Sequence, residues 1–129
     1  MYHILVIDDE NLIRTLLRGY LESKGFSVGV AQNGKQALEL FEKQTADLII
    51  TDVFMPEKDG LEVVMALRKK RPDIPIVVVS GGSSKGFRDM LHIAKTLGAA
   101  RVLEKPFKLE ELLATVQALL PPVSPPAKS

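Results

Sequence analysis

Short apolar runs alternate with amphipathic stretches along the whole of this chain. Five runs rich in β-branched residues have the length of strands, and each ends at a polar residue or a turn signal. These runs cover residues 3–7, 26–30, 47–52, 75–80 and 100–104. Between and after them, apolar residues recur every three or four positions, which is the period of an amphipathic helix. The pattern predicts five helices, around residues 12–21, 37–41, 61–67, 85–97 and 109–119.

Local signals set the ends of several of these helices. The first helix shows one apolar stripe, made of Leu12, Ile13, Leu16, Leu17, Tyr20 and Leu21. Gly25 is expected to end it, because glycine readily takes the left-handed conformation that closes a helix. Asn33 is suited to begin the second helix, since its side chain can accept hydrogen bonds from the first turn. The fifth helix is expected to end before Pro121.

Strands that alternate with helices require a parallel sheet with helices on both faces, because each crossover must be right-handed. The expected fold class is a doubly wound α/β sandwich. In such sheets, ligands bind beyond the carboxyl ends of the strands. The polar residues at those ends are Asp8, Asp9, Asp52, Ser80 and Lys105. We therefore expect four strands to bring them to one pocket, with Asp52 at its chemical centre.

Composition narrows the class of protein. The chain has 17 basic and 16 acidic residues and a formal net charge of +1, too balanced to indicate nucleic acid or an anionic membrane as the main partner. It has no cysteine, which excludes disulfides and cysteine-ligated zinc. No apolar run reaches the length of a membrane span and the start does not resemble a signal peptide, so a cytoplasmic location is expected.

One domain is expected over residues 1–120. A chain of 129 residues that is 46% hydrophobic can bury one real core but leaves no room for a second domain. Residues 121–129 are Pro-rich and are predicted to form a flexible tail. Two interpretations of this tail stay open: an unstructured end, or a linker to an output domain outside this chain.

The acidic residues at the strand ends suit a hard metal ion. Three carboxylates held close together repel one another unless a cation lies between them. Mg²⁺ prefers carboxylates, backbone carbonyls and waters, and a phosphate oxygen often completes its shell. Lys105 can offer a point charge to a phosphate-type ligand, and Ser80 a hydroxyl donor. The set therefore suits phosphoryl transfer, with Asp52 as the nucleophile that forms an acyl phosphate.

At these residues the chain resembles the receiver domain of bacterial two-component response regulators, of the stand-alone type used in chemotaxis. The resemblance covers about residues 3–120. Its motifs are Asp8-Asp9, Asp52 followed by Met55-Pro56 and Asp59-Gly60, then Ser80, and finally Lys105-Pro106-Phe107. It implies a flavodoxin-like fold whose five parallel strands lie in the order 2-1-3-4-5, with five helices.

The resemblance also implies a metal site. Asp52 is the expected phosphoacceptor. Asp9 is expected to bind Mg²⁺ directly, and Asp8 to act largely through metal-bound water. Phe54 would contribute its backbone carbonyl to the same ion.

Two further residues complete the implied site. Ser80 would hydrogen-bond the phosphoryl group and shift on activation, and Lys105 would contact a phosphoryl oxygen. The Lys105–Pro106 bond is expected to be cis.

The resemblance also implies a partner: the phosphoryl group would come from a histidine kinase or a histidine phosphotransfer protein. The chain would be a phosphoacceptor signalling domain that assists its own phosphorylation and dephosphorylation, rather than an enzyme.

One departure from the family concerns the aromatic residue that takes part in the usual conformational switch of receivers. Many receivers have Tyr or Phe three residues before the conserved lysine, where the ring turns inward on activation. Val102 stands at that place here. A valine is stiff at its first side-chain torsion and too short to span buried and exposed positions. The aromatic half of the usual switch is therefore not expected in this chain.

The output surface is a separate expectation. No effector domain follows the fifth helix, so the phosphorylated state would be recognised by another protein. The expected surface comprises the fourth helix, fifth strand and fifth helix, which carry Lys85, Arg88, Lys95, Arg101 and Lys108. A solvated basic face without a partner is the alternative. A monomer and a phosphorylation-linked dimer both stay open.

Two other functions stay open. One is a Mg²⁺-dependent phosphatase, but its familiar dehalogenase-like version needs a second aspartate two residues after the nucleophile, where Phe54 stands. The other is a phosphorylation-independent pseudo-receiver that acts as an interaction module, although none of the acidic or lysine positions is lost here. His3 and His92 are interpreted as edge or surface residues rather than phosphoryl carriers.

Overall fold

The computed structural model describes residues 1–52, 60–80, 95, 98 and 101–120. The elements are β1 (His3–Ile7), α1 (Asn11–Ser23), β2 (Ser27–Ala31), α2 (Gly34–Lys43), β3 (Leu48–Asp52), α3 (Gly60–Lys70), β4 (Ile76–Ser80), β5 (Arg101–Glu104) and α5 (Leu109–Leu119). Every strand begins and ends within one residue of its predicted position. The helix expected over residues 85–97 and the tail over 121–129 lie outside the described residues, Lys95 excepted.

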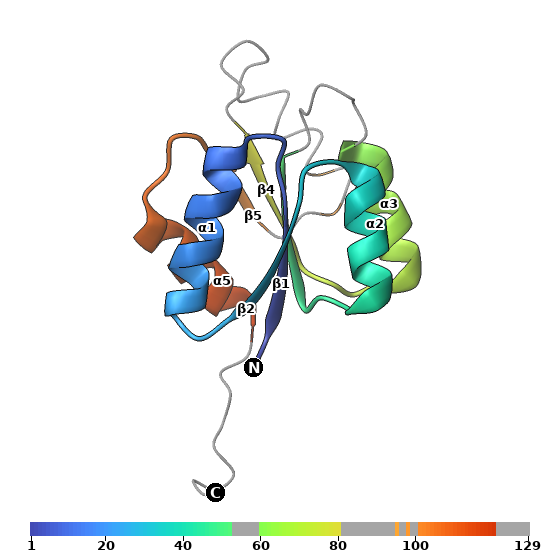
Figure 1. Ribbon diagram of the computed structural model, residues 1–129, viewed down its shortest axis with the longest axis horizontal. Helices are drawn as coiled ribbons and strands as arrows, with labels where there is room; N and C mark the ends of the chain where they lie inside the picture. Colours follow the sequence, from blue (N-terminus) through green and yellow to red (C-terminus); the bar gives the residue numbers. More distant parts are fainter. Residues whose placement is uncertain (53–59, 81–94, 96–97, 99–100, 121–129) are drawn as a thin grey trace, which may run out of the picture.

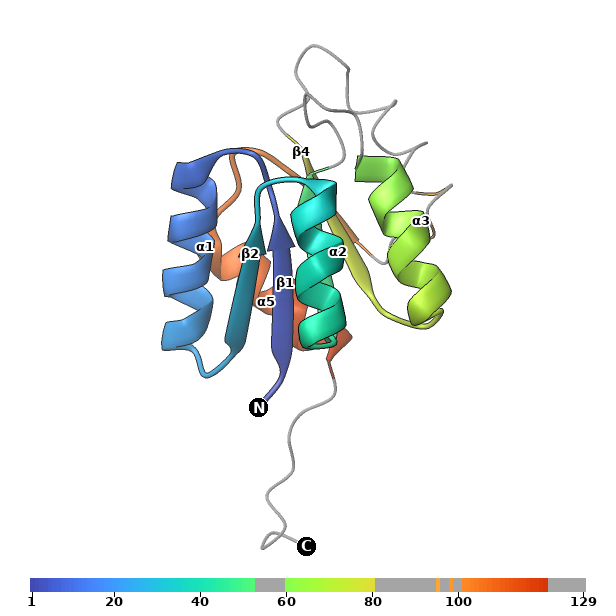
Figure 2. The ribbon, with the colours of Figure 1, turned by 45° about the vertical axis from the view of Figure 1, so that its right-hand side comes forward.

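The five strands form one parallel sheet in the order β2-β1-β3-β4-β5. This order confirms the predicted doubly wound sandwich. Helices α1 and α5 cover one face of the sheet, and α2 and α3 cover the other (Figure 1). The turned view in Figure 2 shows the same division. None of the helices in the described part of the chain combines the length and the apolar character that a membrane span requires.

Each face of the sheet has its own apolar core. Leu5, Ile7 and Ile49 lie among the buried residues that meet α2 and α3. Ile4 and Ile50 belong to the cluster that meets α1 and α5. Neighbouring residues of one strand thus enter opposite cores, as the alternation of side chains along a strand requires. Strands β1 and β3 are buried along their whole length, which explains why their sequences are mostly apolar rather than alternating.

Two predicted helix signals are confirmed. The Asn33 side chain accepts a hydrogen bond from the Gln36 backbone N–H at 2.9 Å and so caps the start of α2. Gly25 has a φ of +97°, a value that other residues rarely adopt, and it lies just past Lys24, the C-cap residue of α1. These signals are local, which is why they could be recognised in the sequence.

The apolar stripe of α1 is only partly buried. Leu17 and Leu21 lie in the core, but Leu12 is 77% exposed and Leu16 is 48% exposed. The amphipathic helix indicated by the sequence is thus present, with only part of its apolar stripe against the core. The stripe is wider than the surface that the sheet offers, so its outer edge remains in water.

The expectation that His3 is an edge or surface residue is wrong. His3 is buried in β1, which pairs with β2 on one side and β3 on the other. Its ring Nδ1 lies 2.9 Å from the Ser27 hydroxyl oxygen, and its backbone N–H donates to Asp47 Oδ2 at 2.8 Å. Burial lowers the pKa of the His3 ring, although the charge of Asp47 and the hydrogen bond with Ser27 act in the opposite direction. A ring satisfied in this way can stay neutral inside the sheet.

His3 should make stability depend on pH. Its folded-state pKa lies below the unfolded value of 6.5, so the unfolded chain takes up the proton first as pH falls. The contribution of the neutral ring is complete above pH 6.5 and is lost below it, by at most about 1.4 kcal/mol per pH unit. We expect the free energy of unfolding to fall more steeply between pH 7.5 and 5.5 in the wild type than in His3→Asn. Urea unfolding at a series of pH values measures both slopes, and equal slopes would contradict a lowered pKa.

Candidate functional site

The site lies where β1, β3 and β5 end. Asp8 directly follows β1, Asp52 is the last residue of β3, and Lys105 directly follows β5. In the register of the sheet, Ile7 of β1 lies beside Thr51 of β3, so the next position of each strand carries a carboxylate. Parallel strands bring these ends to one edge of the sheet. The fold therefore joins residues that are almost a hundred positions apart in sequence.

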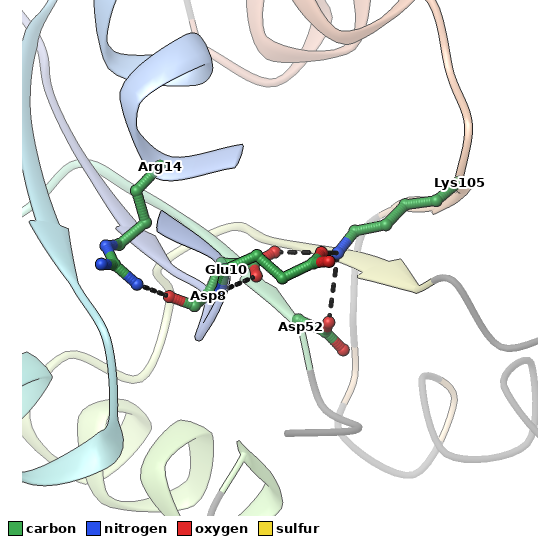
Figure 3. A network of polar contacts seen from close by, with 5 residues as sticks. All are labelled: Asp8, Glu10, Arg14, Asp52 and Lys105. Atoms are coloured by element: carbon green, nitrogen blue, oxygen red, sulfur yellow. Dashed lines mark hydrogen bonds and ion pairs between the residues drawn. The ribbon is translucent and has the colours of Figure 1, made fainter. Parts of the chain in front are cut away.

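The ammonium group of Lys105 is the centre of the site. It donates hydrogen bonds to Asp8 Oδ2 at 2.9 Å, Glu10 Oε1 at 3.1 Å and Asp52 Oδ2 at 3.2 Å. Figure 3 shows the lysine side chain reaching across to these carboxylates. The side chains of Asp8, Asp52 and Lys105 are 1%, 10% and 14% exposed, whereas Glu10 is 59% exposed. Three of the four charged groups are thus largely withdrawn from water.

Burial and charge compete at this centre. Burial alone would lower the pKa of Lys105, but the hydrogen bond to Asp8, the charges of Asp52 and Asp8 and the bond to Glu10 raise it well above its usual value. Burial raises the pKa of the Asp8 carboxyl, and its hydrogen bonds with the Glu10 N–H and with Lys105 offset only part of that rise. Lys105 therefore stays charged, as a counter-ion to buried carboxylates must.

Two residues that the sequence did not single out hold Asp8 in place. The backbone N–H of Glu10 donates to Asp8 Oδ1 at 2.9 Å. Arg14 donates from Nη1 to the Asp8 carbonyl oxygen at 2.7 Å and from Nη2 to Asn11 Oδ1 at 3.1 Å. The acidic run Asp8-Asp9-Glu10 could have drawn attention to Glu10. The spacing of Arg14 from Asp8 matches no motif, so no signal pointed to it.

The acidic residues form a group that suits a metal ion. Asp8, Asp9 and Asp52 each offer a carboxylate oxygen, and these oxygens all lie within 4.8 Å of one another. Asp8 and Asp52 are buried, and Asp9 is exposed to solvent. An all-oxygen set of ligands fits Mg²⁺, which prefers hard ligands and retains waters. The donor chemistry of the chain is therefore compatible with this ion.

Some predicted site residues cannot be placed. Phe54 lies outside the described residues. Ser80 is the last residue of β4, and its backbone lies beside Glu104 of β5, at the same edge of the sheet as Asp52. Its side chain is outside the described part, so the expected hydroxyl contact stays a prediction. The expected cis Lys105–Pro106 bond is present.

The switch position and the basic face are only partly described. Val102 is partly buried and packs against the core that β1 and β3 share with α2 and α3. Lys95, Arg101 and Lys108 are exposed, as an interaction surface requires. Lys85 and Arg88 fall outside the described residues.

The sequence matches a known family over most of its length. A model of the response regulator receiver domain matches residues 4–117. Among curated relatives, the response regulator MprA of Mycolicibacterium vanbaalenii is 43% identical over 122 residues, which is 95% of this chain and 52% of that protein. MprA of Mycobacterium leprae is 42% identical over 91% of this chain and 50% of its own length. The chain therefore spans about half the length of the curated relatives it matches.

Solved structures agree with this match. The chemotaxis response regulator CheY4 of Vibrio cholerae has a TM-score of 0.84 and 34% identity, with 93% of this chain and 99% of that chain covered. The response regulator TrrA of Thermotoga maritima, solved in complex with Mg²⁺ and BeF, has a TM-score of 0.78 and 37% identity, with 93% and 100% covered. Fold, site and sequence agree that this chain belongs to the response regulator receiver domain family of two-component signalling systems.

Proposed function

We propose that this domain accepts a phosphoryl group on Asp52 from a phosphohistidine of a partner kinase or phosphotransfer protein. The observation that carries the proposal is the position of the Lys105 ammonium, 3.2 Å from Asp52 Oδ2 and 2.9 Å from Asp8 Oδ2. A cation fixed beside a carboxylate nucleophile can stabilise the negative charge of an incoming phosphoryl group. Receiver domains as a family interact with histidine kinases and downstream effectors.

The chemistry is a direct displacement at phosphorus. An Oδ atom of Asp52 attacks the phosphorus atom, and the O–P bond forms as the P–N bond to the donor imidazole breaks. The imidazole nitrogen keeps the electron pair and takes a proton from water. Lys105 directly follows β5, and its side chain reaches past the end of β4 to Asp52 on β3. It therefore stays within reach of the oxygens of the new acyl phosphate. Ser80, at the end of β4, is proposed to donate a hydrogen bond to one of them.

A magnesium ion would be held by Asp8, Asp9 and Asp52 together with the backbone carbonyl of Phe54. When bound, the ion neutralises phosphoryl oxygens and so lowers the electrostatic barrier to attack by an anion. The group of carboxylate oxygens within 4.8 Å supports this assignment, as does the complex of TrrA with Mg²⁺ and BeF.

The phosphorylated state is proposed to act as a signal rather than as a step in turnover. Phosphorylation adds negative charge and new hydrogen-bond acceptors beside Lys105, so it can change the surface near β5 and α5. Arg101 and Lys108 on that surface suit an acidic patch of a downstream protein. We assign this role to the domain over residues 1–120.

Phosphorylation should depend on the Asp52 carboxylate. Incubation with acetyl phosphate and Mg²⁺ should add the mass of one phosphoryl group to the wild type and none to Asp52→Asn, as measured by intact-protein mass spectrometry. Asp73→Asn is the matched control, because Asp73 is 86% exposed and lies away from the site. This control should be phosphorylated as the wild type is.

Three other outcomes of this experiment would contradict the proposal. An adduct that persists in Asp52→Asn would place the acceptor elsewhere. Continuous release of phosphate without an adduct would indicate a phosphatase. The absence of both would indicate a pseudo-receiver.

Magnesium should stabilise the fold by binding the carboxylate group. At ten times its dissociation constant, a ligand of the folded state adds about 1.4 kcal/mol, which corresponds to a rise of about 3–6 °C in Tm for a domain of this size. Asp9→Asn should reduce the rise, while Asp73→Asn should retain it. Differential scanning calorimetry at neutral pH, with NaCl added to match ionic strength, measures the effect. An equal rise in all three proteins would mean that the ion acts by general screening.

A further inference from the structure

We propose that the Glu10 carboxylate occupies, in the unphosphorylated chain, the hydrogen-bonding position on Lys105 that a phosphoryl oxygen on Asp52 takes over. Glu10 would thus be a positioning residue that acts through Lys105 and sets how readily the site accepts a phosphoryl group. The inference rests on the proposed function of Asp52.

The ammonium group of Lys105 has no spare hydrogen-bond donor. An ammonium group carries three N–H donors. In this structure it meets three carboxylate oxygens, one each from Asp8, Glu10 and Asp52. A new acceptor oxygen can therefore form a good hydrogen bond with Lys105 only if one of these partners leaves.

Of the three carboxylates that Lys105 contacts, Glu10 is the one that can leave most readily. Asp8 is buried, and the Glu10 N–H also holds its other oxygen, so releasing it would strand a buried charge. Asp52 is the acceptor itself and remains covalently attached to the incoming group. Glu10 is 59% exposed and can return to water at little cost. The phosphoryl oxygen should therefore displace the Glu10 carboxylate from Lys105.

The Glu10 side chain does not cap its own helix. Glu10 stands at the N-cap position of α1 with extended backbone angles, where the shorter side chains of Ser, Thr, Asp or Asn often accept a bond from the first turn. It makes no such cap bond and reaches instead to Lys105, 95 residues away in sequence. Figure 3 shows its carboxylate turned toward the lysine. Replacing this side chain should leave both the helix start and the backbone bond to Asp8 intact.

The prediction is that removing the Glu10 carboxylate makes the site easier to fill. Glu10→Gln keeps the size of the side chain and removes its charge. It should bind beryllofluoride about two- to fivefold more tightly in excess Mg²⁺, the range expected for loss of one exposed ion pair. The acetyl phosphate concentration for half-maximal rate should fall by a similar factor, with little change in the maximal rate. The difference from wild type should shrink at high salt, because screening weakens the exposed pair.

Two further variants make the test specific. Glu10→Asp keeps the charge but shortens the side chain by one methylene, so it should bind beryllofluoride more tightly than the wild type and less tightly than Glu10→Gln. Glu22→Gln removes the same charge from an exposed ion pair with Arg18 elsewhere on α1 and should behave as the wild type does. Fluorine NMR titration of bound beryllofluoride gives the affinities, and calorimetry without ligand checks that all the variants are folded.

The possible results distinguish a failure of the Glu10 inference from a failure of the proposed phosphorylation of Asp52. If the wild type binds no beryllofluoride and gains no phosphoryl group, the proposed function fails and this inference with it. If the wild type binds and Glu10→Gln binds no more tightly, the inference alone is overturned. Equal affinities in Glu10→Asp and the wild type would also overturn it, because charge without contact would then explain the effect. So would a gain in Glu22→Gln as large as that in Glu10→Gln.

Discussion

The hydrogen bonds from Lys105 to Asp8 and Asp52 join the ends of three strands at one buried centre. Two carboxylates that are nearly withdrawn from water lie side by side, and their mutual repulsion is tolerable only because a cation lies between them. The lysine comes from the far end of the chain, so the centre forms only when β5 has joined the sheet. The site is therefore complete only in the fully formed sheet.

The sheet explains why these charges can meet without unfolding the domain. Strands β1 and β3 are buried along their whole length and are mostly apolar, and the carboxylates of the site come only at their carboxyl ends, as Asp8 and Asp52. The two cores thus hold the strands while the charged groups remain at the edge, where waters and a metal ion can reach them. Carboxylates in the middle of β1 or β3 would be buried among apolar side chains, without water or a metal ion to stabilise their charge.

Much of this architecture could be predicted because it depends on local patterns. Residues close together in the sequence determine the strand ends, the helix caps and the polar residues that follow apolar runs. The family motifs supplied the strand order. The features that the sequence did not reveal, with the wrong interpretation of His3 among them, depend on partners from other parts of the chain. Burial of His3 depends on Ser27 of the adjacent strand, and the exposure of Leu12 depends on how wide a surface the sheet offers. The contacts of Glu10 and Arg14 likewise depend on the folded backbone and have no pattern in sequence.

The central claim is that Lys105 neutralises the carboxylates that a magnesium ion would also bind. If so, the two cations compete, and Lys105→Gln should bind Mg²⁺ more tightly than the wild type does. Isothermal titration calorimetry measures both affinities, with Lys70→Gln as a control that removes a lysine from an exposed pair with Glu42. The account predicts tighter binding in Lys105→Gln and unchanged binding in Lys70→Gln. Equal or weaker binding in a folded Lys105→Gln would contradict it.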